Sequence, residues 1–75
     1  MVYIVIEIQT NADGTVGNIV TKYDNLPEAE AKWHSILAFA ATSTLPVHSA
    51  VILDSDGMTM AQRSYRHEQE ASNEG

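Results

Sequence analysis

The chain has 75 residues, no cysteine, and a formal net charge of −6 from ten acidic and four basic side chains. A chain of this length folds as one domain with a small core, and without cysteine it has neither disulfides nor thiolate metal sites. The acidic charge disfavours duplex DNA or RNA, and no apolar run is long enough to span a membrane. We therefore expect one cytoplasmic domain that gains stability by self-association.

A strand, a turn and a second strand are predicted first. Residues 2–9, VYIVIEIQ, form a β-branched run that is apolar on both faces over its first half, which favours a central strand. The NADG segment that follows ends in Asp13-Gly14, a signal for a two-residue hairpin turn. Residues 15–23 are the returning strand, in which Gly17 is a candidate bulge.

A helix is predicted from Leu26 to about Thr42. Asn25 is its expected N-cap, with Glu28 as capping-box partner, and the Thr-Leu-Pro segment at 44–46 ends it. Apolar residues recur at helical spacing along one stripe, which comprises Leu26, Ala29, Trp33, Ile36, Leu37 and Ala40. An opposite stripe of small residues is either ordinary helix surface or a helix–helix contact; it comprises Ala31, Ser35, Ala38 and Thr42.

A second hairpin is predicted, with strands at 47–54 and 58–67 and a turn at 54–57. The expected fold is an α+β domain of ββαββ order over residues 1–67. In it, one helix packs on one face of a four-stranded antiparallel sheet whose first and third strands are central. Residues 68–75 are polar, and we expect them to form a disordered tail.

The two faces of this sheet are expected to have different partners. The helix is expected to cover the face that bears Ile4, Ile6 and Ile8. The opposite face would then be an exposed apolar surface, with Tyr3, Val5, His48 and Ile52 on it. We expect that face to form the interface of a homo-oligomer, a dimer or a higher order.

Catalytic and metal signals are weak. His-Ser occurs twice, at 34–35 and 48–49, but on different predicted surfaces and without a nucleophile turn, so packing or interface roles are favoured over catalysis. The three histidines lack the spacing of a local metal site. The DSDG segment at 54–57 lacks the later ligands of a calcium loop, and turn chemistry explains it. No cofactor is expected.

The strongest candidate site is a cluster of cations and aromatic rings. Arg63, Tyr65 and His67 share one face of the last predicted strand, and Arg66 lies on the other. A guanidinium binds phosphate and a ring stacks on a base, so the cluster suits a small nucleotide-type ligand. The alternative is an edge strand protected by its charges. The full candidate set is Arg63, Arg66, Tyr65, His67, Lys22, Trp33, His34 and His48.

Three segments carry a resemblance: YIVIEIQ at 3–9, EAEAKWHS at 28–35 and VHSAVIL at 47–53. With these, the chain to about His67 resembles a group of small uncharacterised proteins encoded by phages and prophages of gut Firmicutes. No catalytic residue or cofactor carries over from that group. The resemblance implies a context, namely a phage gene product that works in the host bacterial cytoplasm or in a virion.

That context favours one function over its rivals. We expect a non-enzymatic, oligomeric protein that counters host defence by sequestering a nucleotide-type immune signal. One alternative is a minor component of the virion or of tail assembly. Another is a protein that inhibits a host defence enzyme by direct contact.

Overall fold

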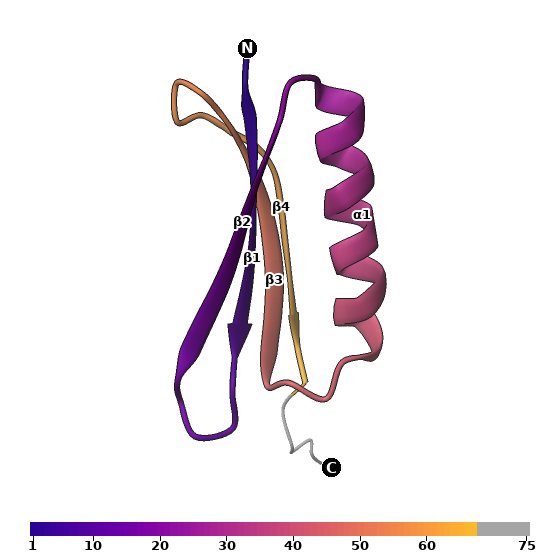
Figure 1. The fold of residues 1–75 in the computed structure, drawn as a ribbon. Helices are drawn as coiled ribbons and strands as arrows, with labels where there is room; N and C mark the ends of the chain where they lie inside the picture. Colours follow the sequence, from indigo (N-terminus) through magenta and orange to yellow (C-terminus); the bar gives the residue numbers. More distant parts are fainter. Residues whose placement is uncertain (68–75) are drawn as a thin grey trace.

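The computed structural model describes residues 1–67, and the expected tail at 68–75 lies outside the described residues. The elements are β1 (Tyr3–Thr10), β2 (Val16–Tyr23), α1 (Leu26–Thr42), β3 (Val47–Asp54) and β4 (Thr59–Arg66). The strands form one antiparallel sheet of order β2-β1-β3-β4, and α1 runs along one face of it (Figure 1). The predicted ββαββ fold, with β1 and β3 central, is confirmed.

Both hairpins close through three-residue loops, so the two-residue turn expected at NADG is wrong. The N–H of Asn11 donates to the carbonyl of Thr15 at 2.8 Å, and the N–H of Gly14 donates to the carbonyl of Asn11 at 3.0 Å. Gly14 has a φ of 91°, which the last position of this loop type requires, and Gly57 has 84° in the second hairpin. An Asp-Gly pair predicts a glycine with positive φ, but hairpin loops of two residues and of three residues both use such a glycine.

The bulge expected at Gly17 is absent, because Gly17 pairs with Gln9 in a continuous register between β1 and β2. A register shift occurs instead between β3 and β4, where Ile52 pairs with Ala61 and Leu53 with Thr59. Bulges increase strand twist, which is one of the ways in which proteins protect an edge strand such as β4 from pairing with another chain.

The helix begins and ends as its sequence predicts. Asn25 has extended backbone angles, and its side-chain oxygen accepts the N–H of Glu28 at 2.9 Å. At the other end the N–H of Ser43 donates to the carbonyl of Ala40 at 3.3 Å. The predicted apolar stripe faces the sheet, and its buried members are Ala29, Ile36, Leu37 and Ala40.

The helix covers the sheet face that was expected to be open. Val5 and Ile52 pair with each other across β1 and β3, and both are fully buried against α1, together with Ile36. The expectation that Ile4, Ile6 and Ile8 face the helix is therefore wrong, and so is the oligomer interface predicted on Tyr3, Val5, His48 and Ile52. Because β1 is apolar on both sides, hydrophobic alternation cannot select the covered face.

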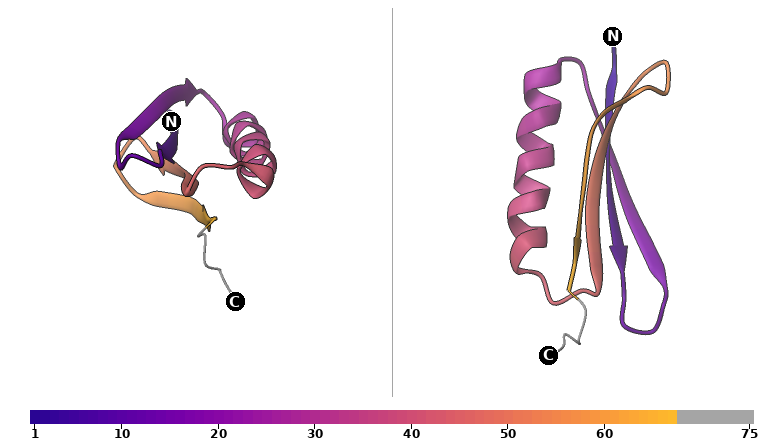
Figure 2. Two further views of the ribbon diagram at one scale, coloured as in Figure 1. Left: turned by 90° about the horizontal axis from the view of Figure 1, so that it is seen from below. Right: turned by 180° about the vertical axis from the view of Figure 1, so that it is seen from behind.

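Small residues at the contact give a physical reason for the observed choice. Ala29 on α1 and Ala50 on β3 are almost completely buried, so the helix approaches the sheet closely there. The indole N–H of Trp33 donates to the carbonyl of Ala50 at 3.1 Å, which fixes the helix over β3. No described element covers the opposite face, as the view along the strands shows (Figure 2).

Candidate functional site

Two concave sites flank α1 on the helix side of the sheet. A groove of about 360 Å³ lies between α1 and β4, and we call it the β4 groove. A pocket of about 570 Å³ lies between α1 and β1, and we call it the β1 pocket. The residues that line the β4 groove are Trp33, His34, Leu37, Ala38, Ala41, Arg63 and Tyr65.

The β4 groove brings together four of the residues predicted to bind ligand. Arg63 pairs with Ala50 and Tyr65 with His48, so both β4 side chains are on the helix side of the sheet. Trp33 and His34 come from the facing flank of α1. The alternation of side chains along β4 predicts that Arg63 and Tyr65 share a face. It does not predict that Trp33 and His34 face them, because that depends on how the helix packs on the sheet.

Arg63 is stacked on a ring at this groove. Its guanidinium carbon lies 5.0 Å from the centroid of the Tyr65 ring, which is a cation–π arrangement. Arg63 makes no salt bridge within residues 1–67. On the opposite wall Trp33 and His34 meet edge to face, with ring centroids 5.1 Å apart. As far as the described residues go, the groove therefore offers a guanidinium without a carboxylate partner between aromatic walls.

His67 extends the aromatic row just beyond β4. Its ring is parallel to that of Tyr65, with an interplanar angle of 6° and centroids 6.4 Å apart. Its Nε2 lies 2.7 Å from the carbonyl oxygen of Ala40, so that nitrogen carries the proton and donates it. His67 thus fastens the end of β4 to the end of α1 and supports Tyr65 from outside the groove.

Arg66 and Lys22 are not brought to the groove. Arg66 pairs with Val47 and Lys22 with Ile4, and these positions belong to the sheet face that α1 leaves open. A phosphate clamp made from Arg63 and Arg66 of one chain therefore does not form, because residues three apart on a strand point to opposite faces.

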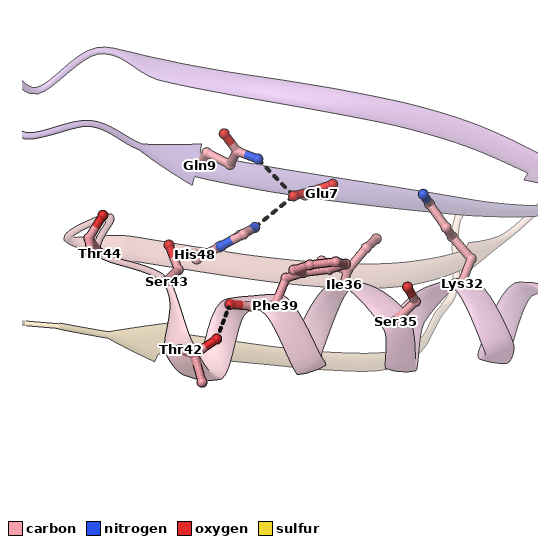
Figure 3. A pocket seen from close by; sticks show the side chains of 10 residues that line it. All are labelled: Glu7, Gln9, Lys32, Ser35, Ile36, Phe39, Thr42, Ser43, Thr44 and His48. Atoms are coloured by element: carbon pink, nitrogen blue, oxygen red, sulfur yellow. Dashed lines mark hydrogen bonds and ion pairs between the residues drawn. The ribbon is translucent and has the colours of Figure 1, made fainter.

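His48 lies in the β1 pocket, where it pairs with a residue that the sequence interpretation did not select. Its Nε2 donates to Oε2 of Glu7 at 2.7 Å, and the amide of Gln9 donates to the same oxygen at 2.7 Å (Figure 3). The imidazole is only 4% exposed. The signal that could have identified this site is the placement of Glu7 and Gln9, two polar residues on the face of β1 that begins with Tyr3 and Val5.

The carboxylate of Glu7 is negatively charged at neutral pH. Burial raises the pKa of Glu7, but the hydrogen bonds from Gln9 and His48 and the charges of His48 and Lys32 outweigh it. The pKa therefore lies below its ordinary value of 4.5. The pocket is lined by Glu7, Gln9, Lys32, Ser35, Ile36, Phe39, Thr42, Ser43, Thr44 and His48.

The histidine–carboxylate pair lacks an engaged nucleophile. His48 Nδ1 is buried and has no hydrogen-bond partner in the described part of the chain, so no hydroxyl is bonded to the imidazole. Nucleophilic catalysis needs a hydroxyl or thiol within reach of such a base. As it stands, the pair is a buried polar contact between β1 and β3 that places a negative charge in the pocket.

Metal-binding geometry is likewise missing between residues 1 and 67, where no group of three or more His, Cys, Asp or Glu side chains could hold an ion. The carboxylate of Asp54 is used within its own turn, since Oδ1 accepts the N–H groups of Asp56 and Met58, each at 2.9 Å. Turn chemistry therefore accounts for the DSDG segment.

Comparison of the chain with protein-family models, with curated proteins and with solved structures finds no match. Among residues 1–67 no helix is both long enough and apolar enough to cross a membrane. The geometry of the two concave sites and of the open sheet face is therefore the basis for a functional assignment.

Proposed function

We propose that the protein is a non-enzymatic binding protein that holds a small nucleotide-type ligand in the β4 groove. The observation that supports this most directly is the Arg63 guanidinium, which lies on the Tyr65 ring and opposite Trp33 in one groove. A guanidinium donates paired hydrogen bonds to phosphate, and aromatic rings stack on bases. Both halves of a nucleotide therefore have a partner here.

Local charge favours the β4 groove over the larger β1 pocket for an anionic ligand. Within residues 1–67 no acidic side chain lines the groove, whereas the pocket contains the ionised carboxylate of Glu7. Charges are screened over about 8 Å at physiological salt, so the acidic net charge of the chain does not prevent a small anion from binding beside Arg63. Lys32 lines the same pocket, so its charge is balanced by that of Glu7, whereas the described lining of the groove holds only the charge of Arg63.

The resemblance to phage-encoded proteins suggests the biological role of such binding. A stoichiometric binder that sequesters a nucleotide-type immune signal in the host cytoplasm needs affinity and copy number, and no catalytic group. Self-association is part of this proposal, because the large buried hydrophobic side chains of the described chain are few: Val5, Ile36, Leu37 and Ile52.

A second candidate function rests on a different observation. The open sheet face is apolar and suits contact with protein rather than with a nucleotide. This favours a role as a minor virion or tail-assembly component, or as a direct inhibitor of a host defence enzyme. Recovery of the protein in purified virions, together with no nucleotide binding, would select the structural role.

Calorimetric titration against a panel of cyclic dinucleotides and relatives of cyclic ADP-ribose tests the proposal. We expect one of these nucleotides to bind, and Arg63→Ala to weaken it about tenfold or more, since a charge-assisted hydrogen bond contributes about 1.5–3 kcal/mol. Arg66→Ala is the matched control, because it removes the same charge from the opposite face and should leave affinity within about twofold. Equal losses in both variants, or no binding to any nucleotide, would contradict the proposal.

A further inference from the structure

The sheet face that α1 leaves open has a continuous apolar centre. Ile6 on β1 pairs with Val20 on one side and with Val51 on the other, and Ile4 pairs with Leu53, so the apolar positions of three adjacent strands meet. We call this surface the open face. Its large apolar side chains are Ile4, Ile6, Ile8, Val16, Val20, Val47, Val51 and Leu53.

The open face bears eight large apolar side chains, whereas only four are buried in the core beneath the helix, with further partly buried side chains packed against them. The core's buried members include three alanines, which contribute little to burial: Ala29, Ala40 and Ala50. On the open face Val20 remains 51% exposed and Val16 62% exposed. Apolar side chains gathered on one uncovered face are typical of a protein contact.

Among the strand positions of the described residues, the border of the open face is polar and carries no negative charge. The outer strands contribute amide, hydroxyl and cationic side chains, namely Asn18 and Lys22 on β2, and Gln62, Ser64 and Arg66 on β4. No aspartate or glutamate occupies any β1–β4 position paired on this face, although the chain contains ten acidic residues. An apolar centre with a polar rim is the usual anatomy of a protein–protein interface.

We propose that the open face packs against the same face of a second copy of this chain. The result is a two-fold dimer with two sheets inside and the two helices outside. This specifies the surface for the self-association that forms part of the proposed function. Two antiparallel sheets that pack face to face in this way form a sandwich about 10 Å thick, with their strand directions within about 30° of each other.

The size of the face is sufficient for a dimer. Strands of eight residues are about 26 Å long, and four strands spaced at about 4.8 Å cover about 19 Å. The product is about 500 Å² for each copy, or about 1,000 Å² for the pair, which reaches the lower limit for a specific interface.

Charge placement makes the face compatible with itself. Lys22 lies on β2 beside Ile4, at the start of β1, whereas Arg66 lies on β4 beside Val47, which pairs with Thr10 at the end of β1. The two cations therefore occupy diagonally opposite corners. A two-fold axis that runs along or across the strands places each cation over an uncharged corner of the other copy, so like charges do not meet.

The β4 groove stays accessible in such a dimer. Arg63 and Tyr65 are on the helix side of the sheet, and the open face is on the other side. Each dimer therefore presents two outward-facing grooves, and dimerisation and nucleotide binding can be tested separately.

Two adjacent residues of β2 provide a matched test by sedimentation. Val20 on the open face and Ile19 on the helix side are each 51% exposed. We expect the wild-type chain at micromolar concentration to sediment at a mass above that of the 8.2 kDa monomer. Val20→Glu should weaken association about tenfold or more, since it buries a charge in an apolar contact, whereas Ile19→Glu should leave association unchanged.

Circular dichroism should be used to check that both variants are folded, and nucleotide titration separates the two proposals. If Val20→Glu is monomeric and still binds nucleotide, both the interface proposal and the ligand proposal are supported. If Val20→Glu weakens dimerisation but no nucleotide binds to the protein, the interface proposal is supported and the ligand proposal is rejected. A strictly monomeric wild type, or equal effects of the two variants, overturns the interface. If Val20→Glu does not fold, Val20→Ser is used in its place. Val20→Ser must then weaken association more than Ile19→Ser does.

Discussion

At the residue scale, a single carboxylate oxygen joins the two central strands. Oε2 of Glu7 on β1 accepts hydrogen bonds from Gln9 on the same strand and from His48 on β3. A charge removed from water is destabilising unless it is paired, and these bonds supply the pairing. The consequence is a pH-dependent contribution to stability from Glu7.

The sign of that contribution follows from the lowered pKa of Glu7. A group whose pKa is lower in the folded state stabilises the fold above its ordinary value of 4.5, and the contribution is lost as the pH falls through the folded-state pKa. We expect the free energy of unfolding in urea to decrease below about pH 4.5, and Glu7→Gln to make this decrease smaller. The pKa of Asp13 is also lowered, from its ordinary value of 3.8, by the backbone N–H and then the hydroxyl of Thr15.

Glu30→Gln is the control for this experiment, because Glu30 is exposed on α1 and makes no hydrogen bond or ion pair within the described residues. It should retain the pH dependence of the wild-type chain. If Glu7→Gln and the wild type lose stability in parallel from pH 6 to pH 3, the paired carboxylate has no role in stability.

At the scale of the elements, α1 is fixed by a cap at its start and by one hydrogen bond near its middle. Asn25 accepts the N–H of Glu28, and the indole of Trp33 donates to the carbonyl of Ala50. The sequence predicts the cap, the bounds of the helix and the strands, because these depend on local chemistry. It does not predict the indole bond, because that bond depends on which face of the sheet the helix covers.

Removal of the cap should destabilise the domain without changing the groove. Asn25→Ala leaves the N–H of Glu28 without its side-chain acceptor, and N-cap substitutions of this kind typically lower stability by about 1 kcal/mol. Thermal denaturation followed by circular dichroism measures the effect. Ser35→Ala, on the exposed helix surface, should not lower stability, since alanine has the higher helix propensity. A cap variant as stable as Ser35→Ala would show that Asn25 does not hold the helix start.

Trp33→Phe separates the two roles of the indole. It keeps an aromatic wall for the β4 groove and removes the hydrogen bond to the carbonyl of Ala50, at a cost of about 0.5–1.5 kcal/mol. We expect a lower midpoint in urea with nucleotide affinity reduced less than in Arg63→Ala. Unchanged stability would mean that the indole N–H does not anchor α1.

At the scale of the whole molecule, one helix covers only one of the two apolar faces of the sheet, and we propose that the protein associates through the other face. The order of elements follows from the sequence, but the choice between the two faces of β1 does not, because Val5 and Ile6 are equally suited to a core. The choice of sheet face also determines which of the predicted ligand-binding residues reach the β4 groove. Alternation along β4 predicts that Arg63 and Tyr65 lie together, whereas the assignment of faces removes Lys22 and Arg66 from the groove.

A dimer built on the open face makes thermal stability depend on concentration, because association favours the folded state by mass action. We expect the melting temperature to rise between about 1 and 100 μM chain, and this rise to disappear in Val20→Glu. Ile19→Glu should retain it. A melting temperature independent of concentration in the wild-type chain would argue against a dimer that forms in this range.

The central claim, that a nucleotide-type ligand occupies the β4 groove, is tested most directly by the indole N–H resonance of Trp33. The chain has one tryptophan, so this signal is unambiguous, and it reports from the groove wall. With the bound nucleotide added stepwise, we predict a saturable shift of the Trp33 resonance whose midpoint moves to about tenfold higher nucleotide concentration or more in Arg63→Ala and by no more than about twofold in Arg66→Ala. A ligand that binds while the Trp33 resonance stays in place, or a midpoint that is unchanged in Arg63→Ala, would contradict the claim.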